Sequence, residues 1–557
     1  MLLEDRSSTP DYPPQAPRRW PKRLLVGGIV TLVLAAIAAF VVSAFALSGS
    51  SIEEDGSSLG EVSTETFGGN VSNVRATALK SGDAVPVELK GDRIVPTTPL
   101  RPGEQVTVEA TVKRPSMIGW LAGSEKKLTM TMTAPSASIE TAWISVKKGK
   151  KPYVHFNRPV TQVAYGQPGE LKHRRFDQPR DSFSLGTQPS AGQMIVAGAP
   201  WDKSMEHLGK FKSVTWFPAT GKPTIAANPT AGTTISASTP IELTFSKPVK
   251  KILGSEMPNL SPEVEGKWSQ PNAHTLRFKP SGFGVPLATD LKVELPEEVE
   301  LVQSDGSVQS ATEVKWEVPA GAELRLQQML AGLDYLPYKW NGEEVGKTPE
   351  AQVAAATTEA PKGHFAPRWG NTPSGIKELW TPGEENVLVK GALMTFEEAH
   401  GLEVDGEAGP VVWEALMQAT IAGEKKPTKG AGNGYSYVWV NKTEPETVNL
   451  WHNGKMIVSE APANTGIPGA ETEAGTFPVF LRYEETTMSG ENPDGSHYSD
   501  PGIKWVSYFN GGDALHQFDR ASYGSPQSLG CVEMPNEEAE KIWPYTPIGT
   551  PVTVNPA

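Results

Sequence analysis

The sequence contains one cysteine, Cys531, which lies fifteen residues after His516. A thiolate is a nucleophile and a thiol is a poor one, so a catalytic cysteine needs a nearby base, and a histidine can supply it. Gly530 has no side chain, which would let a carbonyl substrate approach the backbone N–H groups beside the cysteine. These residues predict nucleophilic catalysis at a carbonyl carbon. The alternative is that Cys531 is a small buried apolar residue and His516 an ordinary polar one.

The residues around Cys531 favour catalysis. Ser528, Gly530, Cys531 and Val532 resemble the active-site signature of the L,D-transpeptidases (YkuD fold), in which a histidine at this spacing precedes Ser-His-Gly-Cys and a hydrophobic residue. The expected strand at 505–509 and the Asn-Gly-Gly turn that follows it also stand in the family's order.

Three positions depart from that signature. Leu529 occupies the place of the second histidine, Gln517 that of a common glycine, and Glu533 that of a frequent arginine. If the second histidine only shapes the loop, activity survives. If it assists catalysis, this enzyme is slower or altered.

The resemblance implies a two-step reaction on peptidoglycan stem peptides. His516 acts as base and then acid, while Cys531 attacks the carbonyl between the diamino acid at position three and D-Ala at position four. D-Ala leaves, and the side-chain amine of a second stem resolves the thioester into a 3→3 cross-link. The backbone N–H groups at Gly530 and Cys531 are oxyanion-hole candidates, and Ser528 holds the loop or supports the histidine. The residues expected to line the donor cleft are Tyr483, Met488, Tyr498, Trp505 and Tyr508.

The expected partners follow from the same resemblance and from the composition. Peptidoglycan stems and glycan are the substrates, and carbapenem-type inhibitors are expected to acylate the cysteine. We expect no cofactor, and the nine histidines are dispersed without metal-ligand spacing. A net charge of −13 with scattered Lys and Arg excludes nucleic acid as a partner.

Three other functions stay open. Water could resolve the thioester, which would make the protein an L,D-carboxypeptidase. A non-catalytic scaffold that binds peptidoglycan is kept open by Leu529 and Gln517. A cysteine protease needs the same two residues, but nothing elsewhere in the chain resembles one.

The length of 557 residues and the composition predict several domains rather than one core. Gly and Pro are abundant and helical periodicity is scarce before residue 320, which favours a mainly β, multidomain chain. A single cysteine excludes an internal disulfide and is typical of a reactive thiol in an exported protein.

The N-terminal region predicts a membrane anchor. Residues 1–23 form a Pro-rich, polar tail that ends in basic residues, and 24–47 form an uncharged apolar run long enough for a transmembrane helix. The positive-inside rule places the tail in the cytoplasm and the bulk of the chain outside, in the cell wall. A cleaved signal peptide is the alternative, because small residues near Ala46 could be cut. Residues 48–60 form a linker.

Three β domains are expected to follow, at 61–137, 138–222 and 223–320. The segments 105–112 and 127–133 alternate as half-buried strands do. The second and third domains resemble bacterial Ig-like domains, because 154–160 matches 243–249 and 213–218 matches 274–280. Such modules are expected to act as spacers.

The last two domains carry the expected function. Residues 321–424 have an insertion at 341–373. Their Gln327, Val404-Asp405-Gly406 and Trp413-Glu-Ala-Leu416 resemble the peptidoglycan-binding domain family, in which a Gln usually stands where Glu397 or Glu398 falls. A helical spacer is the alternative. Residues 425–434 form a linker, and 435–557 form the L,D-transpeptidase-like catalytic domain, which begins with alternating strands and a hairpin signal at Asn453 and Gly454.

Overall fold

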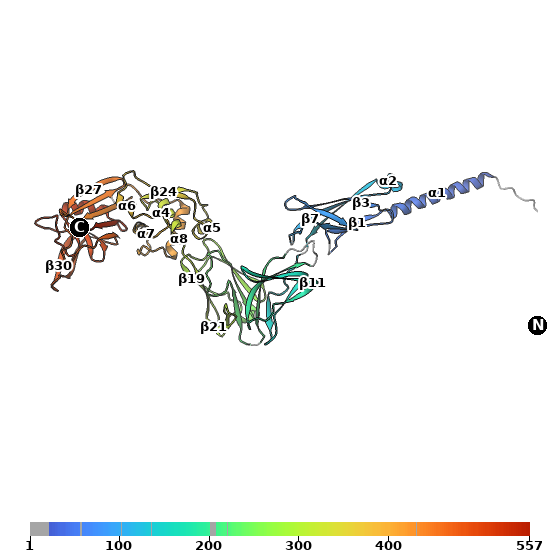
Figure 1. Ribbon diagram of the computed structural model, residues 1–557, viewed down its shortest axis with the longest axis horizontal. Coiled ribbons are helices and arrows are strands. Elements are labelled where there is room, and N and C mark those ends of the chain that lie inside the picture. Colours follow the sequence, from blue (N-terminus) through green and yellow to red (C-terminus); the bar gives the residue numbers. More distant parts are fainter. Residues whose placement is uncertain are drawn as a thin grey trace, which may run out of the picture. The chain divides into compact units, whose positions relative to one another are not determined.

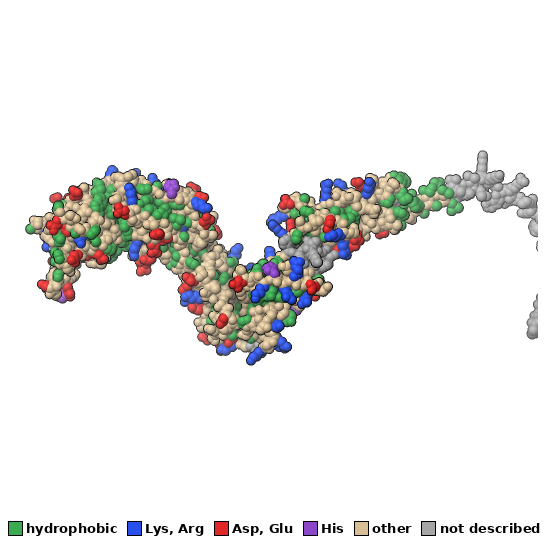
Figure 2. Space-filling view, in the orientation of Figure 1, with side chains coloured by type: hydrophobic (Ala, Val, Ile, Leu, Met, Phe, Trp, Pro, Cys, Tyr) green, Lys and Arg blue, Asp and Glu red, His purple; other side chains and the backbone are tan. Residues whose placement is uncertain are grey.

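The computed structural model describes residues 22–55, 58–101, 103–134, 136–200, 208–219, 221–430 and 432–557 (Figure 1). All but the last two residues of the tail predicted at 1–23 lie outside this range. The contacts divide the chain into one unit of Met1–Ile144, Gly149–Gln188 and Gln193–Thr215, and another of Ser145–Lys148, Pro189–Gly192 and Trp216–Ala557. Acidic and basic side chains are interspersed over the face seen in Figure 2.

The first unit begins with a helix and two sheets. Helix α1 (Lys22–Ala46) covers most of the run predicted to cross the membrane. In the part of the chain whose side chains are described, no helix is both long and apolar enough to span a membrane. The sheets are β1-β2-β6-β5, with strands Ser50–Glu53, Gly60–Thr64, Arg93–Pro96 and Val87–Lys90, and β4-β3-β7-β8, with strands Ala84–Val85, Asn70–Ala78, Gln105–Lys113 and Glu125–Thr133.

The alternation predicted for 105–112 is present in β7. Val106, Val108 and Ala110 are buried, while the residues between them are more exposed. Side chains that alternate in this way let one face of the sheet pack against the core. A short helix, α2 (Ser116–Ala122), connects β7 to β8.

A five-stranded sheet of order β11-β10-β12-β13-β9 follows, with strands Glu170–Ser184, Tyr153–Gln167, Gly192–Pro200, Lys212–Pro218 and Trp143–Val146. The matching segments noted above form a repeat, whose first copy is 154–160 with 213–218 and whose second is 243–249 with 274–280. Strand β12 lies between β10 and β13, the strands that carry the first copy. In the second copy the corresponding strands, β15 (Ile241–Phe245) and β18 (Thr275–Pro280), pair directly. The two copies of the repeat therefore differ in strand order.

Residues 224–318 form two sheets over a shared core. One has the order β17-β18-β15-β14-β20-β21 and the other β16-β19-β22, and α3 (Val249–Leu253) follows β15. Trp316 is fully buried in this core. The remaining strands are β14 (Thr224–Asn228), β16 (Leu260–Ser261), β17 (Gly266–Asn272), β19 (Thr289–Glu294), β20 (Glu300–Val302), β21 (Val308–Ser310) and β22 (Glu313–Val318). The Ig-like assignment and the domain boundaries stay predictions.

We call residues 321–424 the helical part. All of them are described, and they contain five helices and one two-stranded sheet, β23 with β24. The predicted insertion at 341–373 is structured, since it holds most of this sheet and one helix. Pro410 begins α8 and Gly401 ends α7 in the left-handed region (φ 68°), as such residues do at helix ends. The elements are α4 (Glu323–Gly332), β23 (Tyr338–Gly342), α5 (Pro349–Thr357), β24 (Gly363–Pro367), α6 (Ser374–Glu378), α7 (Val387–His400) and α8 (Pro410–Ala422).

The last domain consists of two sheets. The first has the order β27-β26-β25-β33-β28 and the second β29-β30-β31-β32. A core that includes Val438, Leu450, Leu515 and Val532 lies between them. The elements are β25 (Ser436–Asn441), β26 (Thr447–His452), β27 (Lys455–Pro462), β28 (Gly475–Pro478), β29 (Leu481–Glu491), β30 (His497–Asn510), β31 (Asp513–Gln517), β32 (Val532–Met534), α9 (Asn536–Ile542), the 3-10 turn η2 (Trp543–Tyr545) and β33 (Pro551–Asn555).

The helical part and the last domain touch through backbone. Gly391 of α7 faces Gly549, just before β33, and a Cβ on either residue would collide with the carbonyl of the other. One turn along α7, the hydroxyl of Thr395 donates to the carbonyl of Ile548 at 3.0 Å. Only glycine at both positions allows this approach.

Glu397 of α7 is a buried carboxylate in the helical part. Its side chain is fully buried, and Oε2 accepts the N–H groups of Asp405 and Gly406 at 3.1 and 2.9 Å. Its other oxygen, Oε1, has no hydrogen-bond partner within the described ranges. Burial raises the pKa of Glu397 to about 7, although the two N–H groups act to lower it. The folded state therefore binds a proton at Glu397 more tightly than the unfolded chain does.

We expect Glu397→Gln to stabilise the helical part above neutral pH. Because the folded pKa is above the unfolded value, the contribution of Glu397 to stability is fully present below about pH 4.5 and is lost as pH rises through 7, by on the order of 3 kcal/mol. A neutral amide keeps the acceptor without that loss. Thermal unfolding between pH 5 and 8 measures the difference. Glu398→Gln, at the exposed neighbouring position, is the control, and an unchanged pH dependence in Glu397→Gln would contradict the prediction.

Candidate active site

The parallel pairing of β31 with β32 brings Cys531 and His516 to one face of a sheet. His516 pairs with Glu533 and Leu515 with Val532. Extending this register by one residue places Cys531 beside Ala514. Because side chains alternate with a period of two, Ala514 and His516 on one strand face the same side as Cys531 and Glu533 on the other.

His516 is held as a neutral base. Its ring is buried, and Nδ1 lies 2.8 Å from the carbonyl oxygen of Gln517. Since a carbonyl only accepts, Nδ1 carries the hydrogen and Nε2 keeps its lone pair. Burial lowers the pKa of His516 below 6.5, and this outweighs the Gln517 contact and the carboxylate of Glu533, which act to raise it. The imidazole can therefore accept a proton at neutral pH.

Cys531 is a thiol in the resting site. Its residue is partly exposed, and Sγ donates to the carbonyl of Gly512 at 3.6 Å. Burial of the sulfur raises the pKa of Cys531 to about 12, and the nearby Asp513 and Glu533 raise it further. The backbone N–H of Ala514 acts in the opposite direction, because it favours the thiolate. Ionisation of the sulfur thus requires transfer of its proton to a base.

The loop before Cys531 is fixed by hydrogen bonds to the segment after β27. The N–H groups of Gln527 and Ser528 donate to the carbonyl of Thr465 at 2.8 and 3.0 Å, and the N–H of Ile467 donates back to Ser528 at 2.9 Å. Ser528 is buried, and its hydroxyl donates to the carbonyl of Cys531 at 2.6 Å. Ser528 therefore holds the backbone of the cysteine and does not line the cavity.

Gly530 occupies a position that only glycine fits. Its φ of 110° lies in the left-handed region, and a Cβ would lie 2.5 Å from Oδ1 of Asp513. Burial raises the pKa of Asp513, while the N–H of Glu473 and the side chain of Asn510 act to lower it. The carboxyl group of Asp513 thus packs against the bare Cα beside the nucleophile.

Cys531 and His516 line one cavity of about 650 Å³. Three of the five residues predicted to bind the donor, Met488, Tyr498 and Tyr508, line it as well. Burial raises the pKa of both Tyr498 and Tyr508, so their hydroxyl groups stay protonated and can donate hydrogen bonds. The cavity is therefore lined by a nucleophile, a base and tyrosine hydroxyl groups that can donate hydrogen bonds.

The other two predicted donor residues lie outside the lining of that cavity. Tyr483 is 42% exposed, and its ring stands edge to face against that of Tyr508, with 6.4 Å between the ring centres. Trp505 has a positive φ of 58°, and its indole N–H donates to Asn536 at 3.2 Å. Their role in substrate binding stays a prediction.

Residues 435–554 match the YkuD family, described as the L,D-transpeptidase catalytic domain. The C-terminal domain is an L,D-transpeptidase catalytic domain. The protein is therefore an enzyme of the cysteine acyltransferase type, and the domain supports a function in peptidoglycan cross-linking. Among curated proteins, none matches the sequence.

Several solved structures are similar to this chain. An L,D-transpeptidase from Mycobacterium smegmatis is 12% identical over 60% of this chain and 100% of its own, with a TM-score of 0.20. L,D-transpeptidase 3 from Mycobacterium tuberculosis, with a faropenem-derived adduct, is 12% identical over 59% and 97%, also at 0.20. The catalytic domain of the E. faecium L,D-transpeptidase, acylated by ertapenem, is 27% identical over 22% and 96%, again at 0.20.

An ion pair stands in the L,D-transpeptidase site where the signature usually has an arginine. Glu533 is buried, and its carboxylate accepts from Nε and Nη2 of Arg520, each at 2.8 Å. Nη2 of Arg520 also donates to the carbonyl of Gln527 at 3.1 Å, and the guanidinium lies 4.5 Å from the centre of the Phe518 ring. Arg520 and Glu533 both line the cavity, and so does Leu529, which replaces the second histidine.

Sequence reasoning missed Arg520, Asp500 and Asp513, which also line the cavity. Glu533 could have been found, because it lies two residues after Cys531 on a strand and so faces the same side. Arg520 gave no such signal, since it lies in an irregular loop. Within the described residues, no group of three or more His, Cys, Asp or Glu side chains could hold a metal.

We expect Gly530→Ala to slow acylation of Cys531 by ertapenem at least about tenfold, because the added Cβ must displace Asp513 or the cysteine loop. Intact-mass spectrometry over time measures the rate. Gly495→Ala is a matched control, since Gly495 also has a positive φ (82°) but no atom lies within 4 Å of its Cβ position. Equal rates for the two variants would contradict the role of the Asp513 contact.

We expect Arg520→Ala to slow the same acylation at least about tenfold and to shift its pH profile to higher pH. The substitution leaves the buried charge of Glu533 without its partner, which disfavours the thiolate of Cys531. Adding Glu533→Gln should restore most of the rate, because the uncompensated charge is then gone.

Arg482→Ala is the control for this prediction, since Arg482 also packs over an aromatic ring of the same domain, that of Trp543 at 4.1 Å. Its pH profile should match that of the wild type. A wild-type profile in Arg520→Ala itself would show that the pair does not affect the sulfur.

Proposed function

We propose that this protein forms 3→3 cross-links between peptidoglycan stem peptides through a thioester at Cys531. The observation that carries the proposal is the cavity in which a thiol and an imidazole with an available Nε2 lie on one sheet face. Both groups are neutral at rest, which suits a proton transfer that takes place when the substrate is bound.

In the first step the proton of Sγ passes to Nε2 of His516, and sulfur attacks the carbonyl carbon between the diamino acid and D-Ala. The developing oxyanion is stabilised by the backbone N–H groups at Gly530 and Cys531, where the absence of a side chain leaves room. The imidazolium then returns the proton to the amine of D-Ala as the C–N bond breaks. D-Ala leaves, and the acyl group remains on sulfur as a thioester.

In the second step the side-chain amine of another stem attacks the thioester. His516 accepts a proton from that amine, a new amide forms, and the proton goes back to sulfur as the C–S bond breaks. Asp500, Asp513 and Glu533 line the cavity with only Arg520 as a cation among its lining residues. This acidic lining favours an amine over water as the acceptor, and so transpeptidation over L,D-carboxypeptidase activity.

We also propose that α1 anchors the protein in the cell membrane, with the N-terminus in the cytoplasm and the bulk in the cell wall. Support comes from the uncharged run at 24–47 and the basic residues before it. The β domains would then act as spacers, and the helical part would bind peptidoglycan. Both roles rest on the resemblances described for the sequence.

We expect ertapenem to add one acyl group to the wild-type protein and none to Cys531→Ala, as measured by intact mass. His516→Gln should slow the addition about 10²- to 10⁴-fold, because the proton acceptor is lost. His497→Gln is the matched control, since His497 is an exposed histidine of the same domain. A folded wild type that takes up no adduct would leave only a wall-binding scaffold.

The product formed from a stem tetrapeptide tests the acceptor. A dimer with loss of D-Ala supports the transpeptidase, whereas a shortened monomer alone would make the protein an L,D-carboxypeptidase.

A further inference from the structure

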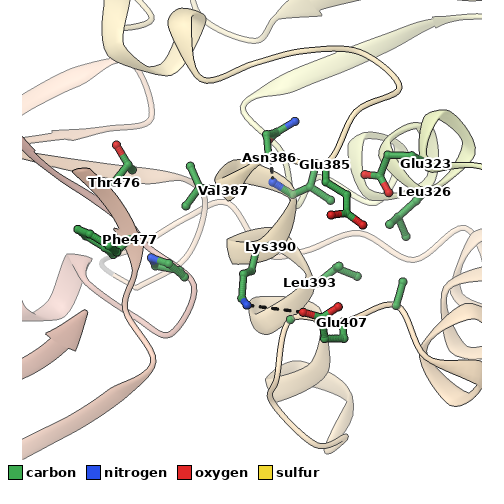
Figure 3. A pocket seen from close by; sticks show the side chains of 14 residues that line it. Glu323, Leu326, Glu385, Asn386, Val387, Lys390, Leu393, Glu407, Thr476 and Phe477 are labelled. Atoms are coloured by element: carbon green, nitrogen blue, oxygen red, sulfur yellow. Dashed lines mark hydrogen bonds and ion pairs between the residues drawn. The ribbon is translucent and has the colours of Figure 1, made fainter. Parts of the chain in front are cut away.

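A second cavity, of about 510 Å³, lies between the helical part and β28 (Figure 3). We call it the junction cavity. The side chains on one side come from α4 and those on the other from β28, with α7 between them (Figure 3). Its walls include Glu323 and Leu326 of α4, Val389 and Leu393 of α7, and Phe477 and Pro478 of β28.

Glu323 brings a partly buried carboxylate to this cavity. It is the first residue of α4, and its Oε1 is buried without a hydrogen-bond partner in the part of the chain that the structure describes. Burial raises the pKa of Glu323 to about 7, and the neighbouring carboxylate of Glu385 adds to the shift. Glu385 itself is exposed, so the site opens to solvent on that side. A partly buried carboxylate with an unpaired oxygen is stabilised by a proton or by a cationic ligand.

The other charged groups of the junction cavity leave room for such a ligand. Lys390 of α7 pairs with Glu407, with Nζ 3.6 Å from Oε1. No ion pair of Glu323 or Glu385 is found among the described side chains, and their carboxylates lie near each other in Figure 3. The cavity therefore has two carboxylates without a paired cation at one end, while its only lysine is paired with Glu407 and apolar side chains of α4, α7 and β28 complete much of the wall.

We propose that the junction cavity binds the amine-terminated side chain of a diamino acid in a peptidoglycan stem peptide. The ammonium group would lie between Glu323 and Glu385, and its methylene groups would pack on Leu326, Leu393 and Phe477. The choice of a stem peptide rests on the proposed function, since such stems are the substrates of the neighbouring domain. No residue of the active-site cavity takes part.

The wall formed by β28 connects the two cavities along the chain. Two residues before β28, the N–H of Glu473 donates to Oδ2 of Asp513 at 3.5 Å, and Asp513 packs against Gly530 beside the nucleophile. The residues 476–478 that would contact a stem in the junction cavity thus follow three residues after the one that donates to Asp513.

Calorimetric titration of the full-length Cys531→Ala protein tests the proposal, because this variant binds stems without turnover. The probes are an N-terminally blocked stem tripeptide that ends in L-lysine and the same peptide acetylated at its side-chain amine. At pH 8 the free amine should bind at least about tenfold more tightly than the acetylated form. Its affinity should fall about tenfold from pH 8 to 6, as Glu323 takes up a proton.

Adding Glu323→Gln or Glu385→Gln should remove most of the preference for the free amine. Glu350→Gln is the matched control, because Glu350 lies in the first turn of α5 but is exposed and outside the cavity. Equal affinity for the two peptides, or an unchanged preference in both cavity variants, would overturn the proposal. Ertapenem acylation of the Cys531 protein reports on the catalytic proposal alone, so the two failures are distinguishable.

Discussion

The active site depends on the parallel pairing of two short strands, β31 and β32. Because the side-chain period of a strand is two, a slip of one residue would turn Cys531 away from the face that carries His516. A strand of three residues cannot fix its own register by hydrophobic burial alone. The register is secured at its N-terminal end, where buried Ser528 and the carbonyl of Thr465 hold the loop that leads into the cysteine.

Burial sets the charge state of the catalytic pair. Removing water disfavours both the thiolate and the imidazolium, so the resting site contains the two neutral forms. Glu533 and Asp513 add negative potential at the sulfur, and the bidentate contact with Arg520 offsets the charge of Glu533. The site thus differs from one that stores a ready-made ion pair, since its nucleophile forms only when the proton moves to His516.

How far the sequence could predict this site depended on how regular each segment is. Cys531 and His516 were expected in one site and line the same cavity, because motif spacing and strand alternation both act over short distances. Alternation along β32 could also have revealed Glu533, which lies two residues after Cys531. Trp505 could not be placed, since its positive φ interrupts the strand, and Arg520 reaches the cavity from a loop without periodicity. For the β domains, the strands at 105–112 and 127–133 are present, but the order of strands around β12 depends on long-range pairing that local similarity does not encode.

The contact between Gly391 and Gly549 restricts which amino-acid substitutions can be accepted during evolution. A single extra methyl group at either position would force two backbones apart, so the two residues can only be replaced together with a change of docking geometry. The helical part is for that reason not an interchangeable module. If the catalytic domain were fused to a different helical domain, it would pack against that domain in the same way only if the new helix also had a glycine opposite Gly549.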